Sequence, residues 1–158
     1  METISYIHYG STALDPDRFV PVHNRFPFGV KPEGGLWASR TTAGGWKQWC
    51  LDNDFHLDSL KKSFRFHMKD QSRVYVIHTI EDAKRLPQVV LAPEFKHLRM
   101  PNTILIDFEK CRKMGIDGIE LRYYEDDHAE NAGNLYLALY TWDCDSMVVL
   151  NPDAIVPD

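Results

Sequence analysis

The placement of short strand-like segments at both ends of the chain is the feature that most constrains its fold. Residues 3–9, TISYIHY, are β-branched and aromatic and stop at a glycine, which predicts a first strand. The segment DSMVVLNPDAI predicts a last strand that stops at Asn151 and Pro152, because residues at such a junction leave regular structure. Helical patterns lie between these ends. The order predicts an α+β fold with a mixed or antiparallel sheet split by helices.

The interior of the chain supplies the remaining elements. Residues 11–35 hold four prolines and no sustained period, which predicts a long irregular connection, followed by a short strand over Leu36–Ser39. SFRFHMK and RVYVIHT alternate apolar and polar residues around DQS and predict a hairpin. Helices are expected after Thr41 or Thr42, in IEDAKRLP, and in TILIDFEKCRKMG, where Gly115 is the stop signal.

Composition narrows the class of protein. A length of 158 residues predicts one domain over 1–158, and a net charge of −5 gives no footprint for non-specific binding to nucleic acid or anionic membranes. Three widely spaced cysteines, Cys50, Cys111 and Cys144, form neither a disulfide framework nor a zinc pattern. No signal peptide or transmembrane segment is visible, so we expect a cytoplasmic protein without a metal and without a membrane partner.

The stretch KPEGGLWASRTTAGGWKQWC, residues 31–50, holds four glycines and three of the four tryptophans. It contains neither the G-x-G-x-x-G fingerprint nor a Walker loop. A strand that carries Trp37 and a helix that carries Trp46 predict an aromatic slot for a planar ring, with core burial of both as an equal alternative. Trp49, beside Cys50, is expected in the core.

Two further segments hold candidate site residues. In IHYGS, His8 and Tyr9 end a strand, and Gly10 lets backbone groups approach a ligand; a structural histidine is the alternative. In GIDGIE, Glu120 lies inside an apolar run. It is either exposed to solvent or placed against a ligand, where a carboxylate stabilises a developing cation.

Together and in order, these motifs resemble the ADP-ribosyltransferase superfamily. IHYGS, GGLWAS, the aromatic in GGW, GIDGIE and SMVVLNPDAI are similar to the motifs of its diphtheria-toxin and poly(ADP-ribose)-polymerase-like branch, whose triad is His, Tyr and an acidic residue. There are two departures. Trp37 stands in the tyrosine place, and the extra tyrosine in IHYGS leaves open whether His8 or Tyr9 takes the histidine place.

The resemblance implies an ADP-ribosyltransferase-like fold that uses NAD⁺ as co-substrate and needs no metal. Trp37 and Trp46 would sandwich the nicotinamide, and Ser39 would support its strand or touch the ribose. Glu120 would be the catalytic carboxylate that stabilises the oxocarbenium-like transition state. The corner that would hold the ribose and carboxamide consists of His8, Tyr9 and Gly10.

The implied activity is mono-ADP-ribosyl transfer from NAD⁺ to a macromolecular acceptor, a protein rather than a nucleic acid. Small transferases of this type include toxins, effectors and phage-encoded modifiers, and the sequence does not decide among them. Two alternatives remain open, an NAD⁺ glycohydrolase and a non-catalytic domain that binds nucleotide or protein. The oligomeric state is likewise open.

Overall fold

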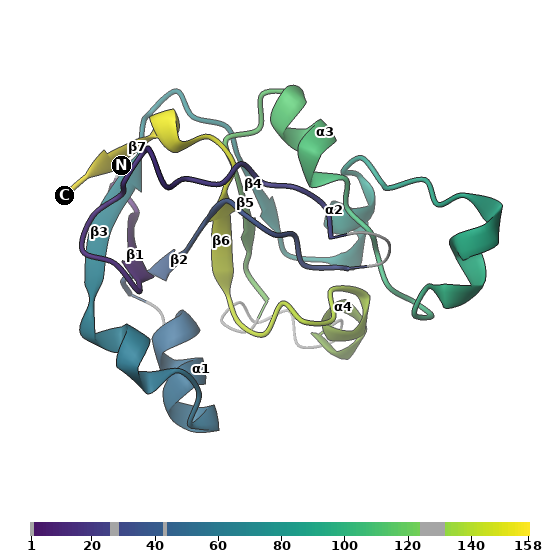
Figure 1. Ribbon diagram of the computed structural model, residues 1–158, viewed down its shortest axis with the longest axis horizontal. Coiled ribbons are helices and arrows are strands. Elements are labelled where there is room, and N and C mark those ends of the chain that lie inside the picture. Colours follow the sequence, from purple (N-terminus) through teal and green to yellow (C-terminus); the bar gives the residue numbers. More distant parts are fainter. Residues whose placement is uncertain (1, 26–28, 43, 124–131) are drawn as a thin grey trace.

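The computed structural model describes residues 2–25, 29–42, 44–123 and 132–158 (Figure 1). Its strands form one seven-stranded sheet in the order β4-β5-β6-β2-β1-β3-β7. Neighbouring strands are antiparallel except β4 and β5, which are parallel. The strands are β1 (Ser5–Tyr9), β2 (Leu36–Arg40), β3 (Ser63–Met68), β4 (Val74–Ile77), β5 (Gly118–Leu121), β6 (Ser146–Val149) and β7 (Ile155–Pro157). The predicted α+β class with a mixed sheet is confirmed.

Short helices surround this sheet. In Figure 1, α1 lies beyond one end of β1 and β2, and α3 lies at the other end of the sheet. No helix in the described ranges combines the length and the apolar character that crossing a bilayer requires. The α-helices are α1 (Gly45–Asn53), α2 (Ile80–Lys84), α3 (Phe108–Lys113) and α4 (Ala132–Ala138), and the 3₁₀ helices are η1 (Leu57–Lys61), η2 (Pro93–Leu98) and η4 (Pro152–Ala154).

The sheet opens between β1 and β2. Only two residue pairs join these strands, Tyr6 with Arg40 and Ile7 with Ser39. Beyond them β1 continues along β3 as far as Tyr9, whereas the first part of β2 pairs with β6. The predicted split of the sheet therefore arises from diverging strands rather than from inserted helices.

The two faces of the sheet carry separate cores, because side chains alternate along each strand. One core holds Ile119 and Val148 and is covered by residues of α2, α3 and α4, such as Phe108 and Leu135. The opposite face packs a smaller core, whose buried members are Tyr6, Leu36, Ala38, Phe66, Met147, Val149 and Ile155. The register of β2 thus decides which of its side chains reaches which core.

The predicted hairpin between residues 63 and 78 is wrong. β3 pairs with β1 and β7, while β4 lies at the opposite edge of the sheet against β5. The intervening segment is held by long-range contacts: the Lys69 amide donates to the Ala154 carbonyl at 2.8 Å, and the Arg73 amide donates to the Asp117 carboxylate at 2.8 Å. Tertiary pairing overrides the local turn signal.

The helix ends differ partly from expectation. Gly44, not Thr41 or Thr42, is the N-cap of α1. The helix α2 begins with a capping box between Thr79 and Asp82. Gly115, with φ of +84°, follows α3 as the predicted stop signal.

Candidate active site

A cavity of about 400 Å³ lies where β1 and β2 diverge. Its walls come from β1, β2, α1, η1 and the segment that precedes β6. Five of the six residues that the sequence selected for NAD⁺ binding line it: His8, Tyr9, Trp37, Ser39 and Trp46. The sixth, Gly10, follows Tyr9 with φ of +115°, a conformation that favours glycine, and its amide donates to the Lys62 carbonyl at 2.9 Å.

The indole of Trp37 is half-buried and is held by a neighbouring tryptophan. Its ring meets the edge of the Trp142 ring at 5.2 Å between centroids and an angle of 77°. Trp142 is buried, and its indole nitrogen donates to the Ser146 hydroxyl at 2.7 Å. One face of Trp37 is therefore oriented by a fixed partner, which favours a preformed ring site.

Ser39 holds the second tryptophan in place. Its hydroxyl donates to the Asp145 carbonyl at 3.1 Å and accepts from the Trp46 amide at 3.1 Å. At Gly45, φ is +50°, and an added Cβ would lie 2.4 Å from the Ser39 Cβ, so only glycine fits there. Ser39 is buried, and these two contacts tie its strand to the start of α1 and to the segment that precedes β6.

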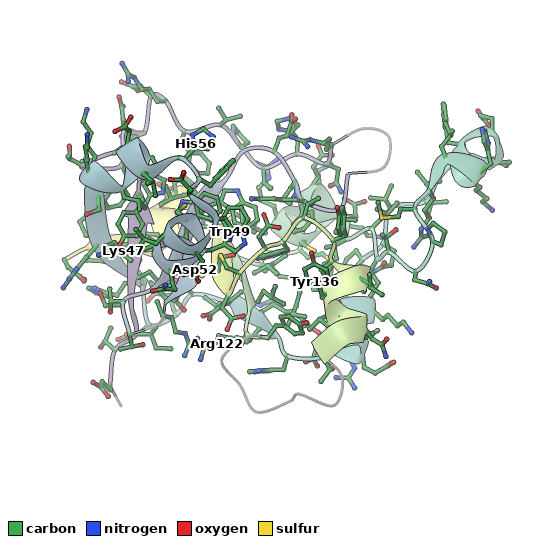
Figure 2. All side chains as sticks on the ribbon, turned by 90° about the horizontal axis from the view of Figure 1, so that it is seen from below. Lys47, Trp49, Asp52, His56, Arg122 and Tyr136 are labelled. Carbon is green, nitrogen blue, oxygen red and sulfur yellow. The ribbon has the colours of Figure 1, made fainter. Side chains whose placement is uncertain are left out.

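Trp49 does not enter the core, contrary to expectation. It is half-buried and stacks on Trp46 at 5.2 Å and 12°, with Phe55 edge-on to both rings. Lys47 and Trp49 extend from opposite sides of α1 (Figure 2). Only Cys50 of this helix is buried, because α1 lies beyond the ends of β1 and β2 rather than across a face of the sheet.

His8 bridges the diverging strands. Its Nδ1 donates to the Trp37 carbonyl at 2.7 Å, and burial lowers the pKa of the ring, although this hydrogen bond raises it. The neutral ring therefore keeps Nε2 as its acceptor. Tyr9, beside it, is half-buried, and desolvation raises the pKa of its hydroxyl. The structure thus gives both residues a place at the cavity.

Asp143 provides the carboxylate among the described residues that line this cavity. It is half-buried, and desolvation raises its pKa while the charge of Lys31 lowers it. The ammonium of Lys31 lies 4.5 Å from the Trp37 ring centroid and 5.8 Å from that of Trp46. We call these four residues, Lys31, Trp37, Trp46 and Asp143, the slot cluster.

Glu120 does not reach the cavity, and its predicted catalytic place is not supported by its position. Along β5 it pairs with Met147 and faces the smaller core, whereas Ile119 faces the core that Trp37 joins. Its carboxylate, 2 % exposed, accepts from Arg40 at 2.6 and 3.0 Å and from the Tyr6 hydroxyl at 3.1 Å. We call these three residues, Tyr6, Arg40 and Glu120, the buried cluster.

Among the cavity residues that the sequence interpretation did not select, three contribute a charge or an aromatic ring to the slot: Lys31, Trp142 and Asp143. The sequence gives little sign that these residues lie near the cavity, because their position depends on the order of strands in the sheet. The segment that precedes β6 meets β2 only because β6 pairs with β2, with Trp37 opposite Val148. The sequence WDCDS directly before a buried strand is the one local hint of an acidic residue at the end of the sheet.

The cysteines give the cavity no nucleophile. Cys144 lines it, but burial raises the pKa of its thiol to about 12, so the thiol stays protonated at neutral pH. Cys50 and Cys111 are also buried. Within the described ranges, no three His, Cys, Asp or Glu side chains group closely enough to hold a metal ion.

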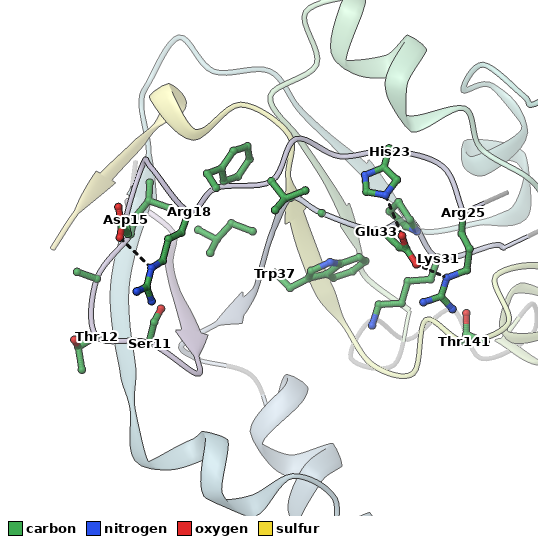
Figure 3. Close-up of a pocket in the computed structure, with 18 residues that line it drawn as sticks. Ser11, Thr12, Asp15, Arg18, His23, Arg25, Lys31, Glu33, Trp37 and Thr141 are labelled. Carbon is green, nitrogen blue, oxygen red and sulfur yellow. Dashed lines mark hydrogen bonds and ion pairs between the residues drawn. The ribbon is translucent and has the colours of Figure 1, made fainter.

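A larger open groove of about 980 Å³ adjoins the cavity and shares Lys31 and Trp37 with it (Figure 3). Arg18 and Arg25 line this groove as well. Arg25 pairs with Glu33 at 3.1 Å, and Arg18 lies 3.5 Å from the Asp15 carboxylate. In Figure 3, Arg18 and Arg25 lie at opposite ends of this groove, with Trp37 and Lys31 between them.

Comparisons with protein-family models, with curated proteins and with solved structures find no match to this chain. The functional interpretation therefore depends on the geometry of the cavity and on the motif order.

Proposed function

We propose that the protein is an NAD⁺-dependent mono-ADP-ribosyltransferase with a protein acceptor. The observation that carries the proposal is the meeting of five residues, chosen for nicotinamide binding from the order of motifs, in one cavity that also holds a carboxylate. These residues lie as much as 38 positions apart in the sequence, from His8 to Trp46. Because NAD⁺ is an intracellular metabolite, the proposal places the activity in a cytoplasm.

The slot cluster suits a positively charged planar ring. The faces of Trp37 and Trp46 already hold a cation, the Lys31 ammonium, within cation–π distance. The oxidised nicotinamide ring of NAD⁺ is itself cationic. Its carboxamide and ribose would lie towards the strand end, where the Nε2 of His8 offers an acceptor and the backbone at Gly10 is accessible.

The proposed reaction breaks the bond between the nicotinamide nitrogen and C1′ of the ribose. The bonding electron pair moves to the ring nitrogen, which leaves as neutral nicotinamide, and positive charge develops on the ribose. Asp143, the cavity carboxylate, would stabilise this charge across a partly desolvated site. A nucleophile of the acceptor then bonds to C1′ and loses its proton. This role moves from Glu120 to Asp143 because Glu120 faces away.

The adjoining groove supplies room for the rest of the dinucleotide. A cavity of about 400 Å³ lies near the lower end of the size range of ligand pockets, about 300 to 1,000 Å³. The diphosphate of NAD⁺ would extend along the groove towards one of its two arginines, Arg25 on the side of Lys31 or Arg18 on the far side of Trp37 (Figure 3). Both arginines are exposed, so they are able to exchange their carboxylate partners for phosphate oxygens.

The surroundings of the cavity favour a protein acceptor. Phe55 lines the cavity and is 40 % exposed, and Leu51 and Leu57 of the same region are also exposed. Apolar side chains grouped at a cavity mouth are typical of a protein-binding surface. The net charge of −5 disfavours a nucleic-acid acceptor.

Labelled NAD⁺ incubated with the protein and a bacterial or eukaryotic cell lysate tests the proposal. We expect label to join protein bands and mass spectrometry to find ADP-ribose adducts. Free ADP-ribose without adducts would indicate a glycohydrolase, and no loss of NAD⁺ in any lysate would contradict the proposal.

Two variants make this experiment specific. Asp143→Asn keeps the shape of the side chain and should lower labelling by about 100-fold or more, since one electrostatic contact to a developing charge has this weight. Asp52→Asn is the matched control, because Asp52 is an exposed aspartate of α1 that bonds Gln48 at 2.7 Å. It should leave labelling unchanged.

A further inference from the structure

The slot between Trp37 and Trp46 contains a cation of the protein itself. The Nζ of Lys31 lies 4.5 Å from one ring centroid and 5.8 Å from the other, and the residue is half-buried. Burial lowers the pKa of this lysine, while the charge of Asp143 raises it. Two indole faces and a carboxylate are the groups that recognise cations in aromatic cages.

The backbone that carries Lys31 is fixed, but its side chain spans two hollows. Glu33 pairs with His23 through two backbone hydrogen bonds of 2.9 and 3.0 Å. At Gly34, φ is +74°, and an added Cβ would lie 2.4 Å from the Pro21 carbonyl oxygen. The segment is therefore anchored close to Lys31. The lysine side chain lines both the cavity and the open groove (Figure 3), and rotation about its side-chain bonds is the movement that would take its ammonium from one to the other.

We propose that Lys31 is the resident cation of this slot, which a positively charged ring ligand displaces and a neutral ring displaces poorly. The inference rests on the proposed function in one respect, that the natural ligand is the nicotinamide ring of NAD⁺. The charged ring replaces the contacts that the ammonium gives up. Once the glycosidic bond breaks, nicotinamide is neutral and no longer replaces them. The return of Lys31 then favours release of the product, which makes Lys31 a specificity-determining residue.

Isothermal titration with two small probes tests the inference without any turnover. The probes are 1-methylnicotinamide, which is cationic, and nicotinamide, which has the same ring and carboxamide but no charge. The native protein should bind 1-methylnicotinamide more tightly. Lys31→Ala should tighten binding of both probes, and of the cation by about tenfold, because a cation–π contact no longer has to be broken. Lys31→Arg retains a resident cation and should bind neither probe more tightly than the native protein.

Lys47→Ala is the matched control. Lys47 is an exposed lysine next to Trp46 on α1, on the side opposite Trp49 (Figure 2), and its removal should change neither affinity. Affinities of the Lys31→Ala variant within twofold of native would overturn the inference, as would equal binding of the two probes or no binding of 1-methylnicotinamide by any of these proteins. If a variant does not fold, the affinities of the native protein for the charged and the neutral probe still test whether the slot prefers a cation.

The proposed function is tested by a separate measurement, the consumption of NAD⁺. If the protein does not consume NAD⁺ but binds 1-methylnicotinamide more tightly after Lys31→Ala, the role of Lys31 is supported and the transferase activity is contradicted. If the enzyme is active but its Lys31→Ala variant binds both probes as tightly as the native protein, only the role of Lys31 is contradicted. In the active enzyme, Lys31→Ala should also strengthen inhibition by nicotinamide several-fold.

Discussion

The slot cluster and the buried cluster each combine a carboxylate, a cation and at least one aromatic ring, and they lie on opposite sides of one sheet. In the buried cluster, Glu120 accepts hydrogen bonds from both Arg40 and Tyr6. In the slot cluster, Asp143 and Lys31 share a half-buried cavity and influence one another by charge. The same residue types therefore form a buried hydrogen-bonded group at one place and the lining of a candidate ligand site at the other.

The two carboxylates differ in their exposure to solvent and in the number of hydrogen bonds that they already accept. A carboxylate whose oxygens are occupied by an arginine and a tyrosine has little capacity left for a substrate, and displacing those partners would leave charges buried without compensation. Burial beside Glu120 also raises the pKa of the Tyr6 hydroxyl, which keeps it a donor. Catalysis needs the opposite: a charge in a desolvated place that the protein has not already neutralised.

The largest expected effect is on stability. Glu120→Ala should lower the free energy of unfolding by about 3 kcal/mol, because it leaves Arg40 and Tyr6 without their shared acceptor. Urea denaturation followed by circular dichroism measures this. Glu109→Ala, at an exposed glutamate of α3, should change the value by less than about 0.5 kcal/mol. A loss at Glu120 no greater than that at Glu109 would remove the distinction between the clusters.

The next effect separates two neighbouring tryptophans. Trp46→Leu should weaken NAD⁺ binding about tenfold, since this ring lies within cation–π distance of the slot. Trp49→Leu should weaken it less than threefold, because Trp49 lies behind Trp46 and does not line the cavity. Titration calorimetry in the Asp143→Asn background, where we expect turnover to be slow, measures both. An equal loss of NAD⁺ affinity in Trp46→Leu and Trp49→Leu would contradict the prediction, because it would show that both changes act through the packing of α1.

The smallest effect concerns pH and the strand junction. The pKa of His8 in the fold is below its ordinary value of 6.5, so the unfolded chain takes up a proton first as pH falls. Stability from a neutral His8 is complete above that value and declines as pH drops towards the folded pKa, by at most about 1.4 kcal/mol per pH unit. His8→Asn should lack this decline. Urea titrations between pH 5 and 8 compare the two, and parallel curves would contradict the prediction.

The sequence predicted the elements better than their pairing. The strands at residues 5–9, 36–40 and 146–149 follow from local sequence patterns, and the helix predicted in IEDAKRLP is present as α2. The hairpin was wrong because a turn signal at DQS says nothing about which strand a neighbour finally joins. The edge position of β4 depends instead on its parallel pairing with β5, a contact between residues more than 40 positions apart.

Only the part of the candidate cavity formed by β1, β2 and α1 could be predicted from the sequence. Residues of β1, β2 and the start of α1 belong to motifs that are visible in the sequence, and the structure brings five of the residues selected from them to one cavity. Glu120 was chosen by the same motif order, but a strand has a side-chain period of two, and its register placed Glu120 on the other face. Asp143 reaches the cavity through the pairing of β6 with β2, which no local pattern specifies.

The rate of NAD⁺ consumption by Asp143→Asn and Glu120→Gln, each normalised to its folded fraction, tests the central claim most directly. Both changes replace one carboxylate by its amide, and they differ in the cluster affected. We predict that Asp143→Asn loses about 100-fold or more in kcat/KM while retaining its stability. Glu120→Gln should unfold at lower urea concentration yet stay within about threefold of native activity per folded molecule. The reverse result, an active Asp143→Asn and a folded but inactive Glu120→Gln, would contradict the account.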